Sequence, residues 1–204
     1  AGAMCAPDGE SADRTWSDRG GYVSGFARVW DPRGFRLKAE ELDRFDPLVQ
    51  WVLHCGREAL APLGHDAKRG DERIGAVVGN LSFPSSGMAA HAEAVLLEGQ
   101  RSLAGGRARE LAGVPERVPE NRFMSGLPGH LLCEALGLGG PSLVLDAAFA
   151  SSLFAIRLAC DALQDGRADV MLAGAVCRSD SRTSAKKKPS RLSVCTTIPG
   201  MLPM

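Results

Sequence analysis

The strongest constraint on the fold of this chain is an alternation of short apolar runs with segments of helical period. The runs are rich in β-branched residues and cover residues 73–80, 142–148 and 168–176. Apolar side chains at both odd and even positions indicate strands covered on both faces, as in a parallel sheet. Helical patterns occur at 86–98, 125–136 and 150–164. The sequence therefore predicts an α/β fold of right-handed βαβ units.

The helix predicted at 150–164 is apolar almost all the way round. Its one early charge is Arg157, among Leu153, Phe154, Ile156, Leu158, Ala159 and Cys160. A helix on the surface of a sheet needs only one apolar side, so this pattern predicts a helix buried between two layers. Gly166 ends it before the third apolar run.

A further helix is predicted nearer the N-terminus. Asp46 and Pro47 suit the N-cap and the first helical position. Pro62 and Gly64 stop the pattern, so we expect this helix to end near Leu60. Its apolar residues follow at helical spacing: Leu48, Trp51, Val52, Cys55 and Leu60.

The charge balance excludes some classes of partner. The 204 residues include 24 basic and 24 acidic side chains, so no overall field favours nucleic acid or an anionic membrane. No apolar run approaches the roughly 20 residues of a membrane span, because Glu134 and Asp146 interrupt the most hydrophobic region. The hydrophobic content of 45% is sufficient for a core. We expect a soluble protein that binds neither nucleic acid nor a membrane.

The cysteines predict neither a metal site nor a disulfide framework. All six are scattered, without a C-x-x-C pair or a nearby histidine cluster: Cys5, Cys55, Cys133, Cys160, Cys177 and Cys195. Free, mostly buried thiols in a chain without a signal peptide fit a reducing compartment. We therefore expect a cytoplasmic location.

Both ends of the chain differ in composition from its centre. Residues 1–20 are small, polar and without periodicity, and predict a disordered lead-in. From Arg182 onward there are five basic residues and no acidic ones, and residues 182–204 predict a basic tail of low order. Two explanations of that tail stay open: a flexible extension, or a segment read out of frame after the third strand.

Between Asn121 and Asp180 the chain holds a helix pattern, a G-P-S strand, the turn DAAFASSL, an apolar helix and a D-x-x-L-A-G strand. In this order they resemble the nucleophile segment of the β-ketoacyl synthases (ketosynthases), above all those of bacterial polyketide and polyunsaturated fatty-acid synthases. Upstream, RGGYVSGFARVWDPRGF, FDPLVQWVLHCGREAL and GAVVGNLSFPSSG resemble the family's early loop, helix and strand. The resemblance covers about Gly20 to Asp180. It implies the N-terminal half of a thiolase-like layered fold, with the domain at 21–181.

The resemblance also implies a chemistry. In this family a cysteine at the start of the buried helix takes an acyl group from phosphopantetheine on an acyl carrier protein, and a decarboxylative Claisen condensation follows. The helix N-terminus favours the thiolate, and backbone N–H groups face the oxyanion. Two histidines of the C-terminal half assist. The resemblance thus implies an acyltransferase that binds no cofactor directly. Its expected partners are the acyl carrier protein and either a second copy of itself, in a homodimer, or an intact ketosynthase.

This sequence departs from the family at the nucleophile. Phe149 occupies the cysteine position in DAAFASSL. A phenyl ring neither ionises nor forms a thioester, so no acyl-enzyme can form there. The family's first strand and its histidine-bearing half are also not found in these residues. We therefore expect the isolated chain to be catalytically incompetent and, with half of a layered fold, to expose apolar surface and to self-associate or depend on a partner.

No other residue is a strong substitute for the nucleophile. Ser151 and Ser152 fall in the first helical turn, where hydroxyls satisfy backbone groups more often than they attack a thioester. Cys160 lies about three turns into the helix and is interpreted as a core thiol. The four histidines (His54, His65, His91 and His130) are interpreted as packing or solvent-facing residues. Gly137, Gly139 and Gly140 precede a strand, so they do not match a phosphate-binding loop.

Three functional hypotheses follow from these residues. The first is a ketosynthase family member that is inactive as an isolated chain. The second is a non-catalytic homologue with a structural or regulatory role beside an intact synthase, although family members of that kind tend to carry a polar residue such as glutamine at the cysteine position. The third is a degenerate gene fragment.

Overall fold

The computed structural model describes residues 25–80, 86–103, 125–178 and 192–194. Its helices are α1 (Ala39–Leu42), α2 (Pro47–Leu60), α3 (Ser86–Leu103), α4 (Leu127–Leu136) and α5 (Ser151–Gln164). Its strands are β1 (Ile74–Asn80), β2 (Ser142–Leu145), β3 (Val170–Arg178) and β4 (Leu192–Val194). Short 3-10 turns occur at Phe26–Arg28, Ala61–Leu63 and Ala148–Ala150. The predicted alternation of strands and helices is confirmed.

The strands form one sheet in the order β2-β1-β3-β4. β1 is parallel to both of its neighbours, pairing Ala76 with Ser142 and Ile74 with Val170 at the starts of the two ladders. All seven residues of β1 are buried, as the unbroken apolar run predicted. β2 is shorter than its apolar run, because the chain turns after Leu145. None of its four residues is buried, so the prediction of cover on both faces is wrong for this end strand of the described sheet.

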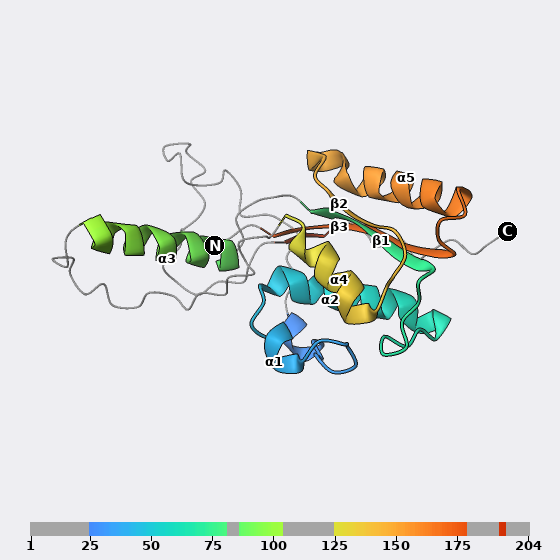
Figure 1. The fold of residues 1–204 in the computed structure, drawn as a ribbon, viewed down its shortest axis with the longest axis horizontal. Coiled ribbons are helices and arrows are strands. Elements are labelled where there is room, and N and C mark those ends of the chain that lie inside the picture. The colour runs from blue at the N-terminus through green and yellow to red at the C-terminus, as the bar shows by residue number, and fades with distance from the viewer. Residues whose placement is uncertain (1–24, 81–85, 104–124, 179–191, 195–204) are drawn as a thin grey trace.

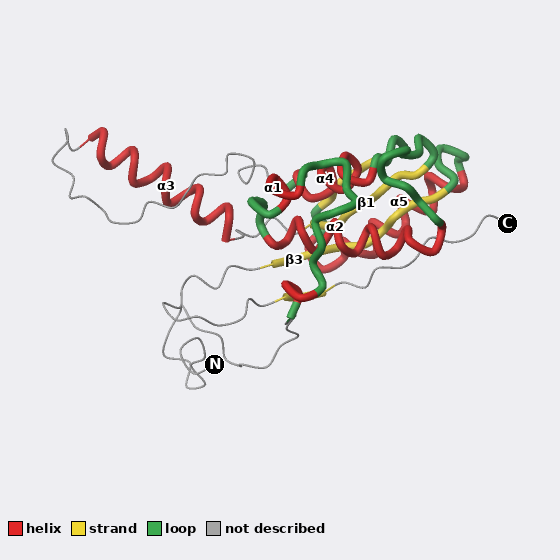
Figure 2. Tube along the Cα trace, turned by 90° about the horizontal axis from the view of Figure 1, so that it is seen from below, coloured by secondary structure: helices red, strands yellow, loops and turns green. Residues whose placement is uncertain are grey.

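Helices cover the two faces of the sheet (Figures 1 and 2). α2 and α4 pack on each other and on one face, while α5 packs against β1 and β3 on the other. α3 lies to one side of this layered body in both views. Helices thus flank both faces of a mainly parallel sheet, as the predicted layered α/β fold requires.

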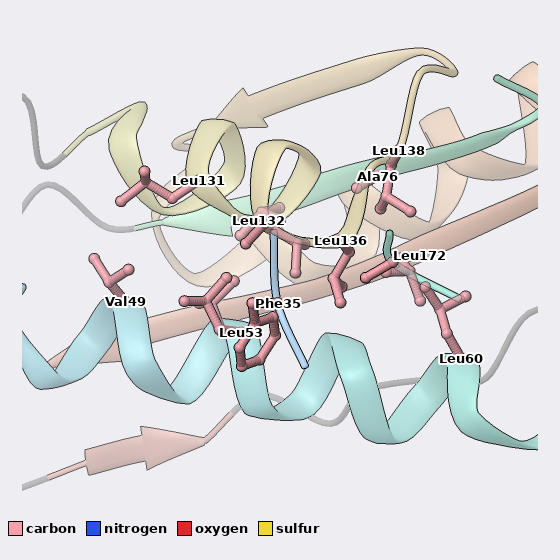
Figure 3. Packing of buried hydrophobic residues seen from close by; sticks show 14 of the residues in the cluster. Phe35, Val49, Leu53, Leu60, Ala76, Leu131, Leu132, Leu136, Leu138 and Leu172 are labelled. Carbon is pink, nitrogen blue, oxygen red and sulfur yellow. The ribbon is translucent and has the colours of Figure 1, made fainter. Parts of the chain in front are cut away.

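The larger core lies between α2, α4 and the sheet (Figure 3). Leucine side chains from the two helices interdigitate there, and Phe35 closes one side. α2 begins as its sequence predicted: the buried Asp46 carboxylate accepts the backbone N–H of Leu48 at 2.9 Å, and Pro47 is the first helical residue. Gly56 lets α4 approach closely, because a Cβ there would lie 2.4 Å from Leu132 Cδ1.

The smaller core lies under α5 and corrects one prediction. α5 buries a stripe of small residues (Ser151, Ala155, Ala159 and Ala162) against the sheet. Its outer side exposes Leu153 and Phe154 to 69% and 54%. The expectation that this helix is buried on both sides is therefore wrong for the described chain, because no second layer lies over it among residues 25–80, 86–103, 125–178 and 192–194.

The two ends of the chain are only partly described. The predicted lead-in at 1–20 lies outside the described residues. Within the predicted tail, β4 pairs antiparallel with β3 through Val194 and Val176. Residues Leu192–Val194 thus form a short strand, while the rest of 182–204 lies outside the described part and its predicted low order stays a prediction. None of the helices described is both long enough and apolar enough to cross a membrane.

Candidate functional site

The turn that carries Phe149 connects edge strand β2 to α5. After Leu145 the chain passes through Asp146 and Ala147 into the 3-10 turn Ala148–Ala150, and α5 begins at Ser151. The Asp146 carboxylate accepts the N–H of Ala148 at 2.9 Å, and the carbonyl of Ala147 accepts the N–H of Ala150 at 3.0 Å. An aspartate that bonds to the backbone two residues later is a common turn former, so Asp146 is a sequence signal for this turn.

Ser151 closes the turn from the helix side. Its hydroxyl oxygen accepts the N–H of Ala147 at 2.9 Å, and its O–H donates to the carbonyl of Ala148 at 2.7 Å. The Ser151 side chain is buried. The prediction that its hydroxyl satisfies backbone groups is confirmed.

The turn packs closely against β1, one of the two central strands of the sheet. A Cβ at Gly79 of β1 would lie 2.8 Å from the Cβ of Ser151 and 2.8 Å from that of Ala175. Only a glycine at position 79 permits this approach without displacement of backbone or core side chains. Sequence reasoning did not single out Gly79, because a glycine in an apolar run is equally consistent with a simple packing gap.

Phe149 projects from the tip of the turn into solvent. Its exposed fraction is 101%, the value of a side chain without protein neighbours. Leu153 and Phe154 on the outer side of α5 and Leu143 of β2 are exposed too. We call these four residues the α5 patch. Large apolar side chains exposed on neighbouring elements are a feature of surfaces that another molecule covers, where they lie together.

The chemistry open to this turn is limited by the side chains present. Phe149 has no ionisable group or lone pair. The Ser151 hydroxyl is committed to two backbone bonds, and neither of these partners is a histidine that could act as its base. Cys160 lies half-buried in α5, away from the tip. The side chains of this turn therefore supply no activated group that could attack a carbonyl carbon.

The four histidines lie elsewhere in the fold. His54 of α2 packs edge-on against Phe26, with ring centroids 5.6 Å apart. His65 bonds through Nε2 to the carbonyl of Leu136 at 2.7 Å. His130 is exposed and lies 3.5 Å from Glu134 one turn along α4. His91 lies on α3. These placements agree with packing and surface roles.

Cys55, Cys133 and Cys160 carry free thiols. Cys55 is exposed and the other two are half-buried, so the expectation of mostly buried thiols is wrong for these three. Burial raises the pKa of the Cys133 thiol, although a hydrogen bond with Ser142 acts in the opposite direction. A raised pKa disfavours the thiolate, so Cys133 is a poor nucleophile. Within the described ranges no group of three or more histidine, cysteine or acidic side chains is placed to hold a metal ion.

An open hollow of about 710 Å³ lies away from the turn, between the start of β1 and α4. Its lining carries ionisable side chains of both kinds, basic and acidic: Arg36, Arg69, Asp71, Glu72, His130 and Glu134. Arg36 is held in place by the carbonyl of Ala67 at 2.6 Å. Gly137 and Gly140 lie along the same connection, and a Cβ at Gly140 would come within 2.7 Å of the Ile74 backbone. Close packing explains these glycines without a bound phosphate.

Comparison with known proteins identifies relatives of this chain. The family model described as "Beta-ketoacyl synthase, N-terminal domain" matches residues 4–188, beyond both predicted domain limits. A PKS-NRPS hybrid synthetase of Aspergillus candidus is 31% identical over 86% of the chain. A 5-methylorsellinic acid synthase of Aspergillus terreus is 33% identical over 72%. The chain spans only 6% and 5% of the lengths of these two relatives.

A solved structure shares the fold. The protein "PfaC Keto synthase-Chain length factor" superposes with a TM-score of 0.68 at 32% identity, over 86% of this chain and 19% of that one. The strand, turn and helix around Phe149 lie within the residues that the family model matches.

Proposed function

The chain belongs to the β-ketoacyl synthase family, through its N-terminal domain, and on this premise we propose that it is a ketosynthase homologue that cannot form an acyl-enzyme. One observation carries the proposal: Phe149 occupies the exposed tip of the turn that opens α5. In the family this is the position of the cysteine that receives the acyl group.

The physical reason is the absence of a reactive group at that tip. Acyl transfer from a thioester requires a thiolate or an activated hydroxyl in reach of the carbonyl carbon. Phe149 supplies neither. Ser151 is buried and its hydroxyl already bonds two backbone groups, so attack would break the turn that holds it. The isolated chain thus has the fold of an acyltransferase family but lacks the residue that forms the acyl-enzyme, the first step of that family's reaction.

A second role is favoured by the α5 patch. β2 is the end strand of the sheet, and one edge of its backbone has no strand beside it in the described sheet. Leu143 lies exposed on this strand, and Phe149, Leu153 and Phe154 are exposed on the turn and the helix that follow. We propose that a second copy, or an intact ketosynthase, covers this surface, and that the chain then acts as a structural partner in polyketide or fatty-acid assembly.

The remaining roles follow from the family. We propose that an acyl carrier protein, with its phosphopantetheine-bound acyl group, is the substrate-bearing partner of the assembly, and that this chain binds no cofactor of its own. Free cysteines agree with a reducing compartment, and we propose a cytoplasmic location.

Acylation is tested by incubating the full chain with an acyl N-acetylcysteamine thioester and measuring its intact mass. We expect no stoichiometric adduct. Phe149→Cys restores the thiol, and this variant should gain one acyl group, located at residue 149 by peptide mapping. Phe149→Ala is the matched control, because it also removes the ring but supplies no nucleophile.

Two outcomes would count against the proposal. A stoichiometric, thiol-labile adduct on the unaltered chain would show that another residue accepts the acyl group. A Phe149→Cys variant that folds but gains no adduct would show that more than the nucleophile is missing from this turn. The partner role is tested separately by light scattering, where a monodisperse monomer, unchanged by an added intact ketosynthase, would contradict it.

A further inference from the structure

The turn before α5 is held in a conformation that its backbone does not favour. Ala148 has a φ of 49°, the only positive φ of a non-glycine residue in the described ranges. For a residue with a Cβ this left-handed region costs about 1–2 kcal/mol relative to the right-handed one. Such a conformation persists only where the surrounding contacts impose it.

Two side chains impose it. The Asp146 carboxylate accepts the N–H of Ala148, and the Ser151 hydroxyl donates to the carbonyl of the same residue. The N–H and the carbonyl of Ala148 therefore each form a hydrogen bond with a side chain. Ser151 also accepts the N–H of Ala147, so one hydroxyl spans two successive peptide units.

The Ser151 side chain has little freedom to move. It is only 3% exposed, and its Cβ packs over Gly79 of the central strand. The backbone N–H of Ser151 bonds to the carbonyl of Ala148 as well, so that carbonyl receives two donors from one residue. The hydroxyl thus connects the turn to a fixed point of the sheet, whereas Asp146 is exposed.

We infer that Ser151 is the positioning residue for position 149: its hydroxyl holds Ala148 in the left-handed region and thereby directs the side chain of residue 149 out of the turn at the start of α5. This rests on the proposed function, because position 149 is taken as the acyl-accepting position of the fold. Without the hydroxyl, the N–H of Ala147 loses its acceptor, and Ala148 is free to relax to negative φ.

The test uses a thiol at position 149 as a reporter of its surroundings. The full chain is prepared as Phe149→Cys alone and combined with Ser151→Ala or Ser152→Ala. Each protein is alkylated with iodoacetamide across a range of pH, and the rate at residue 149 is read by peptide mass mapping, which separates it from the six other cysteines. A thiol held at a helix start titrates below its ordinary pKa of about 8.5.

We expect Ser151→Ala to move the midpoint of the alkylation profile upward and to slow the reaction at pH 7 about tenfold, since one pKa unit changes the thiolate fraction about tenfold. Ser152→Ala removes a hydroxyl one residue later, and its alkylation rate at pH 7 should stay within about twofold of the rate of Phe149→Cys alone. If Ser151 had only a structural role, Ser151→Ala would lower the urea concentration at the unfolding midpoint but would leave the pH profile of alkylation unchanged. Identical profiles for the two alanine variants would overturn the inference.

A second pair of variants covers the case in which Ser151→Ala does not fold. Ser151→Thr and Ser151→Val have the same shape, but only threonine keeps the hydroxyl. The threonine variant should retain the low pH midpoint of alkylation at residue 149, and the valine variant should not. Equal pH midpoints for the two variants would reject the positioning role. The alkylation readout needs no acyl donor. If the Phe149→Cys variant gained no acyl group but showed a low-midpoint alkylation profile, the result would therefore count against the proposed function and leave the role of Ser151 intact.

Discussion

α2 and α5 are both 14-residue helices, and they lie on opposite faces of the same sheet, yet they are built differently. α2 has an aspartate N-cap and a proline at its first position, and it buries large side chains such as Leu48, Val49 and Leu53. α5 has no side-chain cap and buries mainly alanines. Its large residues face outward, where Leu153 and Phe154 are exposed.

The difference shows on which face of the sheet the described chain buries its own large apolar side chains. The face under α2 is closed by α4 and the loop that carries Phe35, so its apolar residues are satisfied within the chain. The alanines of α5 allow a close approach to β1, and the turn before the helix uses that proximity to present residue 149. The outer leucine and phenylalanines have no counterpart in the described residues. α2 therefore contributes mainly to the stability of this chain, whereas our proposals assign to α5 the presentation of residue 149 and the contact with another molecule.

The largest expected effect contrasts one leucine from each helix. Leu53 is fully buried in α2, so Leu53→Ala should lower the free energy of unfolding by about 2–5 kcal/mol through lost burial and a cavity. Leu153→Ala, the same change on the exposed side of α5, should alter it by no more than about 0.5 kcal/mol. Urea titration followed by circular dichroism measures both. Equal losses would mean that the side chain of Leu153 is as fully buried within the folded chain as that of Leu53.

The N-cap of α2 should contribute an intermediate amount. Asp46→Ala removes the acceptor of the Leu48 N–H, and we expect a loss of about 1 kcal/mol in the same urea titration. Asp46→Asn keeps an oxygen in place and should lose less. If both variants lost the same amount, the contribution of Asp46 would lie in its charge and not in the cap.

A smaller effect is expected at the turn before α5. Ala148→Gly removes the Cβ that disfavours positive φ, although glycine also gains freedom in the unfolded chain, so the net change should be neutral to about 1 kcal/mol stabilising. Ala147→Gly is the control, because Ala147 has a φ of −126° and should only lose stability. A destabilised Ala148→Gly variant would contradict the strain at this turn.

The smallest effect on stability should accompany a large effect on association. Replacing Phe154 by glutamine on the outer side of α5 should change the free energy of unfolding by less than about 0.5 kcal/mol. It should nevertheless weaken binding of a hydrophobic dye and self-association, measured by fluorescence and light scattering. Glu58 of α2 is exposed on the opposite face, and Glu58→Gln should change neither property. An unaltered association state for the Phe154 variant would show that the α5 patch is not the contact surface.

Much of the fold was predictable from the chain because local signals were strong. Asp46 and Pro47 marked the start of α2, and the β-branched run at 73–80 became a fully buried strand. The bounds of β2 were less predictable. Its apolar run continues through Ala147 and Ala148, but the Asp146 carboxylate and the Ser151 hydroxyl bend the backbone there. Alanine carries no signal that separates a strand from a turn.

The burial of α5 could not be predicted from its own composition. An all-apolar helix indicates that both sides are covered, but the pattern does not say which molecule supplies the cover. Along α5 the small residues recur every three to four positions, which would have identified the side facing the sheet. The remaining leucine and phenylalanines then belong to the side that this chain leaves open.

By itself the sequence determined the α/β class and the family, and it gave the proposal that Phe149 replaces the nucleophile, because each depends on residue types in a fixed order along the chain. Only the tertiary structure decided how the turn around Phe149 is held. The hydroxyl of Ser151, the positive φ of Ala148 and the space at Gly79 act together across residues far apart in sequence. That geometry depends on packing between a strand and a helix, and packing is a property of the folded chain.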